Sequence, residues 1–364
     1  YNKIVQGILD IGEAMLQSGA ENFRLEDSFY RMCRSYGFKR SDVFVIPSNI
    51  QVTVETPEGE IITQIRHIES SEPNFDQLDY LNNLCRYVCQ HTPDENEMRE
   101  KYLEVINREP QKRITRYAAG IMGGTGFAVF FGCNLWDAVI AFIVSVMIVA
   151  VGDWLAKRES NLLVYNGILA FISEVIIIGA LKMGIAEHPD RIMIGIVMLL
   201  ISGLSTTNGI RDLLQRDFIS GFINIMNSFL GAAGIAFGIG LAIILFHEGY
   251  SDHFILNHSV PIQLLSCTVA CTGFALWFKI RGKQVWYNSI GAFFTWAIYV
   301  AVYAVKPSNF LATMIAAGFV GFYAFIMSRV NKAPSTIFLT ASVFPLIPGP
   351  NLYYVMSVSY THLR

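Results

Sequence analysis

Two short stretches decide how this chain is read: residues 199–212, with the sequence LLISGLSTTNGIRD, and residues 345–350, with the sequence PLIPGP. Each lies well inside an apolar segment long enough to cross a membrane. Proline lacks an amide donor and glycine weakens a helix, so we expect both segments to be interrupted there. Lipid offers no partner to a freed carbonyl, so the breaks should line a substrate site. A simple packing kink would give the same pattern.

The two stretches belong to an internal repeat. LISG at 200–203 recurs as LIPG at 346–349, an offset of 146 residues, and the same offset places apolar segments one to four on segments six to nine. A repeat with an odd number of spans must face the opposite way across the bilayer, and inverted repeats are typical of transporters. The fifth segment has no counterpart, so we expect a second repeat of four helices, with a tenth helix missing.

Charge and hydropathy divide the chain into two regions. Residues 1–113 carry 13 Lys/Arg and 19 Asp/Glu, whereas residues 114–364 carry only 14 and 10. Because about 20 apolar residues cross a bilayer, the second region holds nine candidate spans. They lie at about 114–132, 135–156, 161–181, 191–210, 218–246, 260–278, 284–305, 308–328 and 334–356.

Residues 1–113 read as an α+β domain. Apolar residues recur at helical spacing from Ile4 to Leu16, and further helices are expected at 21–36, 75–90 and 95–107. Alternating stretches at 43–46, 50–54 and 61–65 indicate a small antiparallel sheet with helices on one face. No convergent nucleophile and base occurs in this domain, which argues against the alternative of a membrane-tethered enzyme or sensor.

The fold class is therefore a multi-span α-helical membrane protein with inverted five-helix repeats and an N-terminal cytoplasmic α+β domain. We divide it into the domain at 1–113, a first membrane repeat at 114–246 and a second, truncated repeat at 260–356. The polar tail at 359–364 is expected to be non-native, and the start at Tyr1 without Met reads as a trimmed N-terminus.

Glu174 lies near the centre of the third predicted span. A carboxylate at that depth costs about 2.5 kcal/mol or more unless it is paired or protonated. It is either a proton-coupling group or part of a buried polar network. The equivalent residue in the second half is Val320, so the repeats differ chemically.

Polar groups gather beside the first break. Hydroxyls, an amide and an Arg/Asp pair near freed backbone groups could hold both ends of a zwitterion, although a charged interfacial cap would look the same. Asn166, Asn224 and Asn227 should face inward, away from lipid. The candidate substrate-binding residues are Ser202, Gly203, Thr207, Asn208, Arg211, Asp212, Pro348, Gly349 and Asn351.

Several other functions find little support. A net charge of −2 offers no basic surface for nucleic acid. The six cysteines do not form a disulfide framework, and Cys85/Cys89 and Cys267/Cys271 read as small buried residues. Three histidines at 247, 253 and 258 with two acidic neighbours have irregular spacing for a metal site. We expect neither a metal nor a cofactor.

The motifs together resemble the threonine/serine exporter family. The resemblance rests on SGAE at 18–21, RLE at 24–26, TNGIRD at 207–212, Ser220-Gly221 and FPLIPG at 344–349. It implies a ten-span inner-membrane exporter driven by the proton gradient, here with two modules fused and with Ser202 where a proline is usual. The split-chain relatives are associated with succinate export.

We therefore expect a secondary exporter of small hydroxy amino acids, threonine or serine, working in exchange for protons. Dicarboxylate efflux is the alternative in the same class. The expected partners are the substrate, protons and membrane lipid, and a homo-oligomer is left open.

The distribution of basic residues predicts the orientation of the spans. With residues 1–113 in the cytoplasm, twelve Lys/Arg fall in inside loops or at their borders and three fall outside, as the positive-inside rule requires. A cysteine placed at position 253 should therefore react with a membrane-impermeant thiol reagent in intact cells. Labelling from the cytoplasmic side only would reject this orientation.

Overall fold

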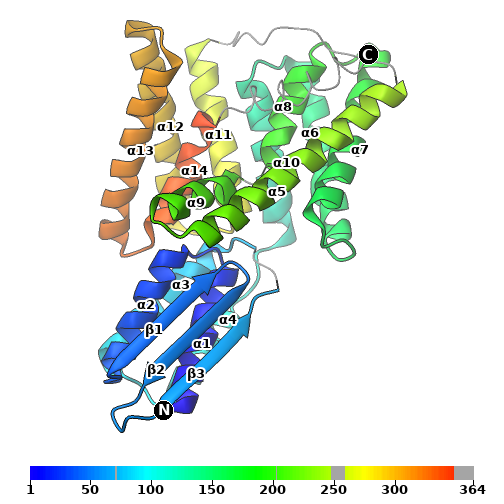
Figure 1. The fold of residues 1–364 in the computed structure, drawn as a ribbon. Coiled ribbons are helices and arrows are strands. Elements are labelled where there is room, and N and C mark those ends of the chain that lie inside the picture. Colours follow the sequence, from blue (N-terminus) through cyan, green and yellow to red (C-terminus); the bar gives the residue numbers. More distant parts are fainter. Residues whose placement is uncertain (70–71, 202, 247–258, 348–364) are drawn as a thin grey trace. The chain divides into compact units, whose positions relative to one another are not determined.

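The computed structural model describes residues 1–69, 72–201, 203–246 and 259–347 (Figure 1). These residues form two compact units. The first contains Tyr1–Pro110, Ser205–Ile225 and Phe278–Ile280. The second contains Gln111–Leu204, Met226–Trp277 and the chain from Arg281 onward.

The first unit is built on a three-stranded antiparallel sheet, as the alternating pattern predicts. Its strands β1 (Arg40–Ile46), β2 (Asn49–Glu55) and β3 (Ile61–His67) pair in chain order. Along the central strand Ile50, Val52 and Val54 are buried at every second position. Since successive side chains of a strand point to opposite faces, these residues turn one face of the sheet toward the core.

Four predicted helices cover that face: α1 (Asn2–Gln17), α2 (Asn22–Ser35), α3 (Phe75–His91) and α4 (Glu95–Ile106) (Figure 1). Phe29 on α2 and Phe75 on α3 are among the largest fully buried side chains. Asn74 and Asp94 cap α3 and α4 by accepting the amides of Gln77 and Glu97, which is why these helices begin there.

The second unit is helical, with α5 (Arg113–Phe130), α6 (Leu135–Leu155), α7 (Leu162–Lys182) and α8 (Pro189–Leu200) in its first half. α9 (Gly203–Leu214) lies mostly in the first unit, and α10 (Phe218–Phe246) contributes residues to both. The second half holds α11 (Val260–Trp277), α12 (Lys283–Val305), α13 (Asn309–Asn331), α14 (Ser335–Val343) and the 3-10 turn η1 (Phe344–Leu346).

The described residues contain fewer spans than the nine predicted. Six helices are long and apolar enough to cross a membrane, namely α6, α7, α10, α11, α12 and α13, and the bent pair α8 and α9 makes a seventh. α5 is helical but falls short, because Arg113, Arg116 and four glycines dilute its hydropathy. The predicted span at 334–356 is helical only to Val343 and turns at Pro345, and its part beyond 347 lies outside the described residues.

Helix boundaries recur at the offset of 146 residues. Adding 146 to the ends of α8 gives 335 and 346, which are the start of α14 and the end of η1. Adding it to the ends of α5 gives 259 and 276, one residue from the ends of α11. These helix boundaries therefore agree with the offset read from the sequence to within one residue.

Small residues let the helices of the second unit approach closely. A Cβ on Gly126 of α5 would lie 2.9 Å from Cα of Ala270 on α11, the two equivalent helices of the repeat. On α10, a Cβ at Gly234 would collide with the carbonyl oxygen of Leu163 on α7. Such contacts between backbones are typical of helices packed in lipid, where close van der Waals contact replaces the hydrophobic effect.

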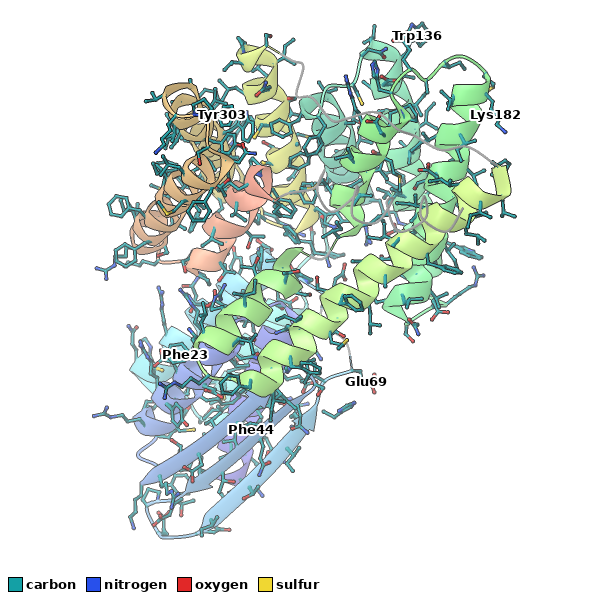
Figure 2. The ribbon with its side chains drawn as sticks, turned by 45° about the horizontal axis from the view of Figure 1, so that its top comes forward. Phe23, Phe44, Glu69, Trp136, Lys182 and Tyr303 are labelled. Atoms are coloured by element: carbon teal, nitrogen blue, oxygen red, sulfur yellow. The ribbon has the colours of Figure 1, made fainter. Side chains whose placement is uncertain are left out.

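Exposed aromatic residues lie at the ends of several helices in the second unit. Two of them are Trp136, at the start of α6, and Tyr303, near the end of α12 (Figure 2). Their exposed fractions are 61% and 42%. Tryptophan and tyrosine at such places are typical of membrane–water interfaces.

The contact between Gly234 and Leu163 predicts a sharp effect of a small substitution. Gly234→Ala should destabilise the protein by about 2 kcal/mol, because the new methyl group meets a backbone atom that cannot rotate away. The matched control is Gly318→Ala on α13, where a Cβ meets nothing within 4 Å. The control should change stability by no more than about 1 kcal/mol. Thermal unfolding in detergent compares them, and equal midpoints would contradict the packing argument.

Candidate functional site

The first break in the membrane unit separates α8 from the helix that follows it. α8 ends at Leu200, and Ile201 adopts extended backbone angles, with φ −72° and ψ 128°. The next helix begins at Gly203. The interruption predicted from the sequence is therefore confirmed at this place, while Ser202 lies outside the described residues.

The second break repeats the same geometry. α14 ends at Val343, η1 carries Pro345, and Ile347 is extended with φ −69° and ψ 127°. Ile201 and Ile347 are equivalent by the offset of 146 and agree within a few degrees in both angles. In both halves the helix therefore ends before equivalent isoleucines, and the backbone adopts the same extended conformation at both.

The two breaks lie beside one another in the second unit. A Cβ built on Gly203 would lie 3.2 Å from Cδ1 of Ile347. Because a side chain at position 203 would press on the second break, glycine allows this approach. We call Leu200–Gly203 together with Phe344–Ile347 the paired breaks.

Asn166 on α7 supports the first break. Its Nδ2 donates to the carbonyl oxygen of Leu200 at 3.5 Å and to that of Gly231 on α10 at 3.2 Å. Asn166 is 2% exposed, as expected for a polar residue that avoids lipid. The amide therefore partners the last carbonyl of α8, which has lost its place in the helical ladder.

Glu174 lies two turns further along α7. It is fully buried, and the adjacent Ser173 donates its hydroxyl to the carbonyl of Leu169. Eight residues separate Glu174 from Asn166, which is about 12 Å along a helix. α7 ends with Lys182, whose amine donates to the carbonyl of Phe246 at 3.3 Å.

The charged end of α9 belongs to the first unit. Arg211 pairs with Glu21, whose carboxylate also contacts Arg24 at 3.3 Å. Asp212 is buried and accepts a hydrogen bond from Nδ2 of Asn224 at 3.0 Å. Two of the stretches that carry the family resemblance, residues 18–26 and 207–212, therefore bind each other.

Other polar contacts belong to the same region of the first unit. Oε1 of Glu26 accepts the amide of Val45 at 3.3 Å, and the hydroxyl of Ser220 donates to the carbonyl of Val45 at 3.5 Å. Burial raises the pKa of Glu26, and the negative charge of Asp217 adds to this, while the amide of Val45 opposes it. The first unit thus holds an acidic cluster in which Arg211 and Arg24 both pair with Glu21.

The structure separates the predicted substrate-binding residues. Gly203 lies at the paired breaks in the second unit, whereas Thr207, Asn208, Arg211 and Asp212 lie in the first. Thr207 is exposed, and Oδ1 of Asn208 is buried with no hydrogen-bond partner in the described structure. Sequence reasoning missed Glu21 as the partner of Arg211, although the motif around it was visible.

Some of the predicted site residues lie outside the described residues, and one prediction is wrong. Pro348, Gly349, Asn351 and the histidine-rich loop at 247–258 lie outside the described residues. Asn227 was expected to face inward but is exposed, as is Leu230 three residues further along α10. Although Asn227 follows Asn224 by three residues and so lies near the same face of the helix, it is not buried.

The described residues contain no group of three or more His, Cys, Asp or Glu arranged to hold a metal ion. The cysteines among them are free, and both Cys267 and Cys271 are fully buried. Burial raises the pKa of the Cys85 thiol to about 12, which keeps it protonated and unreactive.

Apolar helices of spanning length, with two interrupted helices meeting in their midst, define an integral membrane protein of the transporter class. Residues 6–246 match the family model described as "Putative threonine/serine exporter", and residues 263–362 match one described as "Threonine/Serine exporter, ThrE". The chain belongs to the threonine/serine exporter family. It is a transporter and not an enzyme.

Two curated relatives cover almost the whole chain. A "Threonine/serine exporter" of Corynebacterium glutamicum is 23% identical over 360 residues, which are 94% of this chain and 73% of that protein. A "Probable threonine/serine exporter" of Mycobacterium tuberculosis is 22% identical over 366 residues, which are 95% and 68%. No solved structure matches the chain significantly.

The ion pair between Arg211 and Glu21 should be energetically coupled, because its side chains are only 24% and 13% exposed. In a double-mutant cycle with Arg211→Gln and Glu21→Gln, we expect a coupling of about 1 kcal/mol or more. Unfolding in detergent measures it.

The control cycle uses Arg31 and Asp27, a pair on α2 that is 71% and 49% exposed. Its coupling should be no more than about 0.5 kcal/mol. Additive effects at Arg211 and Glu21 would show that the contact does not join these two segments.

Proposed function

We propose that this protein exports small hydroxy amino acids, threonine or serine, across the inner membrane in exchange for protons. The front domain, residues 1–113, is cytoplasmic in this proposal. The observation that carries it is the meeting of the two interrupted helices at Gly203 and Ile347 in a chain of the exporter family.

An inverted relation between the repeats is part of the proposal. α6 and α12 are equivalent by the offset of 146, and in Figure 2 Trp136 at the start of α6 and Tyr303 near the end of α12 lie toward the same end of the helical unit. Equivalent helices that run in opposite directions are what an inverted repeat requires, so this placement supports it. Substrate would then bind where the repeats meet.

The paired breaks suit a zwitterion. The start of the helix that begins at Gly203 carries a positive partial charge, which favours a carboxylate. The carbonyls around Ile201 and Ile347 have left their helices and could accept an ammonium group. A substrate with one group of each sign matches this arrangement, and the names of the two relatives favour an amino acid over a dicarboxylate.

We assign proton coupling to Glu174. Its carboxyl is fully buried within an apolar helix, on the same helix as the residue that holds the first break. A carboxyl in such surroundings exchanges its proton only when the structure changes to admit water, which is how coupling arises.

Transport by the intact protein in vesicles tests the function. Inside-out vesicles should accumulate serine and threonine when a proton gradient is imposed, and succinate should not enter. Accumulation of succinate without either amino acid would reject the substrate class, and accumulation unaffected by the gradient would reject the exchange.

Glu174→Gln tests the proton site separately. The amide has a similar volume but cannot release a proton, so gradient-driven export should fall at least about tenfold, while exchange of substrate for substrate continues. Glu174→Asp should keep some gradient-driven export with a shifted pH dependence. Export against a gradient at the parental rate in Glu174→Gln would mean that Glu174 has a structural role only.

A further inference from the structure

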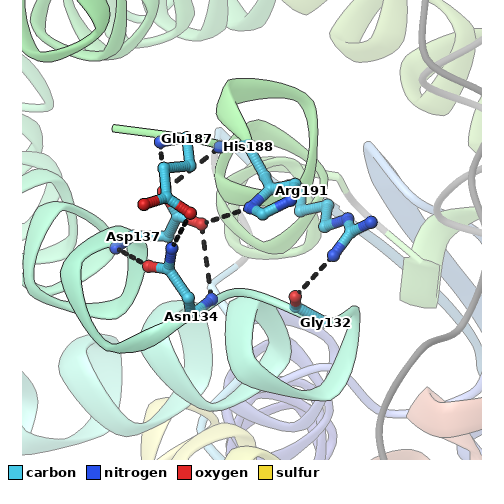
Figure 3. A network of polar contacts seen from close by, with 6 residues as sticks. All are labelled: Gly132, Asn134, Asp137, Glu187, His188 and Arg191. Atoms are coloured by element: carbon cyan, nitrogen blue, oxygen red, sulfur yellow. Dashed lines mark hydrogen bonds and ion pairs between the residues drawn. The ribbon is translucent and has the colours of Figure 1, made fainter. Parts of the chain in front are cut away.

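A second buried carboxylate, Asp137, organises a polar cluster at the other end of α8 (Figure 3). Asp137 is fully buried near the start of α6. One oxygen, Oδ1, accepts the amides of Glu187 and His188 at 2.9 and 3.2 Å. The other, Oδ2, accepts the amide of Asn134 at 3.3 Å and contacts Nδ1 of His188 at 2.9 Å.

This cluster fixes the start of α8. Pro189 is the first residue of that helix, so the two amides bound by Asp137 immediately precede it. At the far end of the same helix, Asn166 holds the carbonyl of Leu200. α8 is therefore tied at both ends to neighbouring helices, by a carboxylate at its start and by an amide at the break.

Three of the contacts to Asp137 come from backbone amides, which do not titrate, and one comes from an imidazole. The hydrogen bond from Nδ1 of His188 needs a hydrogen on that atom, which the imidazolium always carries and the neutral ring carries in only one tautomer. Imidazole is the side chain that ordinarily changes charge between about pH 5 and pH 8. His188 is 30% exposed at its side chain, so protons can reach it.

Acidic side chains outnumber basic ones in the neighbourhood of His188. Asp137 on α6 and Glu187 beside it are acidic, and Oε2 of Glu187 accepts from Nδ2 of Asn134 at 2.7 Å. On α8, Asp190 is buried and Arg191 donates to the carbonyl of Gly132 at 2.7 Å. Three acidic groups and one arginine therefore lie near His188 along the chain or in contact with it.

We propose that His188 is a proton-binding residue that latches the start of α8 onto Asp137. Proton binding adds an ion pair to the two backbone contacts and draws the α7–α8 connection against the start of α6. Loss of the proton leaves only the neutral contacts and frees α8 to move. Because α8 carries the first break, the latch controls the helix that forms the substrate site.

The latch exists in one half of the repeat. At the offset of 146, Asp137 corresponds to Lys283 and His188 to Pro334, which cannot form this pair. The equivalent helix α14 begins after Pro334 with no side-chain cap. The inference rests on the proposed function in one respect: with the front domain in the cytoplasm, the latch faces outside, where protons enter during exchange.

The first test compares His188→Asn with the parent protein in inside-out vesicles, whose lumen contacts the outer face. The asparagine amide can replace the Nδ1 donor but cannot titrate. For an ordinary imidazole the protonated fraction falls about tenfold between pH 5.5 and pH 7.5. With the same pH on both sides of the membrane, so that no gradient contributes, the rate of serine-for-serine exchange by the parent should follow luminal pH over this range. The rate of exchange by His188→Asn should not, although exchange itself continues.

His67→Asn is the matched control, because it removes an exposed imidazole from β3 in the front domain. It should respond to luminal pH as the parent does. A parental response in His188→Asn would overturn the latch. Loss of transport in His188→Asn under every condition, with normal insertion, would also overturn the latch. The asparagine amide still donates a hydrogen bond to Asp137, and this bond should be enough for exchange even though the amide cannot bind a proton.

The second test does not depend on transport. Cys133 is 3% exposed, and the charges of Asp137, Asp190 and Arg191 act on its thiol, so it lies beside the latch. Opening should expose it to a thiol reagent, with the labelled peptide identified by mass spectrometry. Between about pH 6 and pH 8 its labelling should rise more steeply in the parent than in His188→Asn, where only thiol ionisation contributes.

The two tests fail in different ways. If the parent transports neither serine nor threonine, the proposed function is wrong, and Cys133 labelling still decides the latch. If Cys133 labelling has the same pH dependence in the parent, in His188→Asn and in His67→Asn, the latch is wrong whatever is transported.

Discussion

The structure of the membrane unit depends on one constraint: a backbone carbonyl or amide that leaves a helix inside an apolar medium must find another partner. The unit leaves its helices at two equivalent places, after Leu200 and after Leu346. At the first place, the side-chain amide of Asn166 donates a hydrogen bond to the last carbonyl of α8. This requirement explains why an asparagine is fully buried on an otherwise apolar helix, and it ties the position of α7 to that of the break.

Close packing follows from the same constraint. Asn166 also donates to the carbonyl of Gly231, which is possible only because α7 and α10 approach at Gly231, Gly234 and Gly238. A larger residue at these positions would move α10 away from Asn166. The glycines thus do more than fill space, because they bring backbone acceptors within reach of the few polar side chains in the unit.

The local features of this fold could be predicted from the sequence, and the long-range ones could not. The periodicity of apolar residues predicted the sheet and the helices of the first unit, and it predicted α10 with its observed bounds. Gly203, and its match to Gly349 at the offset of 146 residues, predicted the break after Leu200. α5 was predicted as a span but is less apolar than the six long helices, because two arginines and four glycines dilute its hydropathy.

The candidate site was only partly predictable for the same reason. The contact of Arg211 with Glu21 joins residues 190 positions apart, and no local pattern encodes that pairing. Asn134 and Asp137 form a capping box, whose spacing is visible in the sequence. The further contacts of Asp137 with Glu187 and His188 appear only when the fold brings two connections together.

The two halves have corresponding helices but different polar side chains. The polar residues that act on α8 and α7 have apolar or opposite counterparts in the second half: Asn166 corresponds to Ala312, Glu174 to Val320 and Asp137 to Lys283. The helices of the two halves correspond, but their side chains differ. The groups able to bind a proton are therefore concentrated in the first half. The second half contributes Ile347 and its break to the same place. In the proposed exchange, a driving proton would therefore bind to residues of the first half, while both halves contribute backbone to the place where substrate binds.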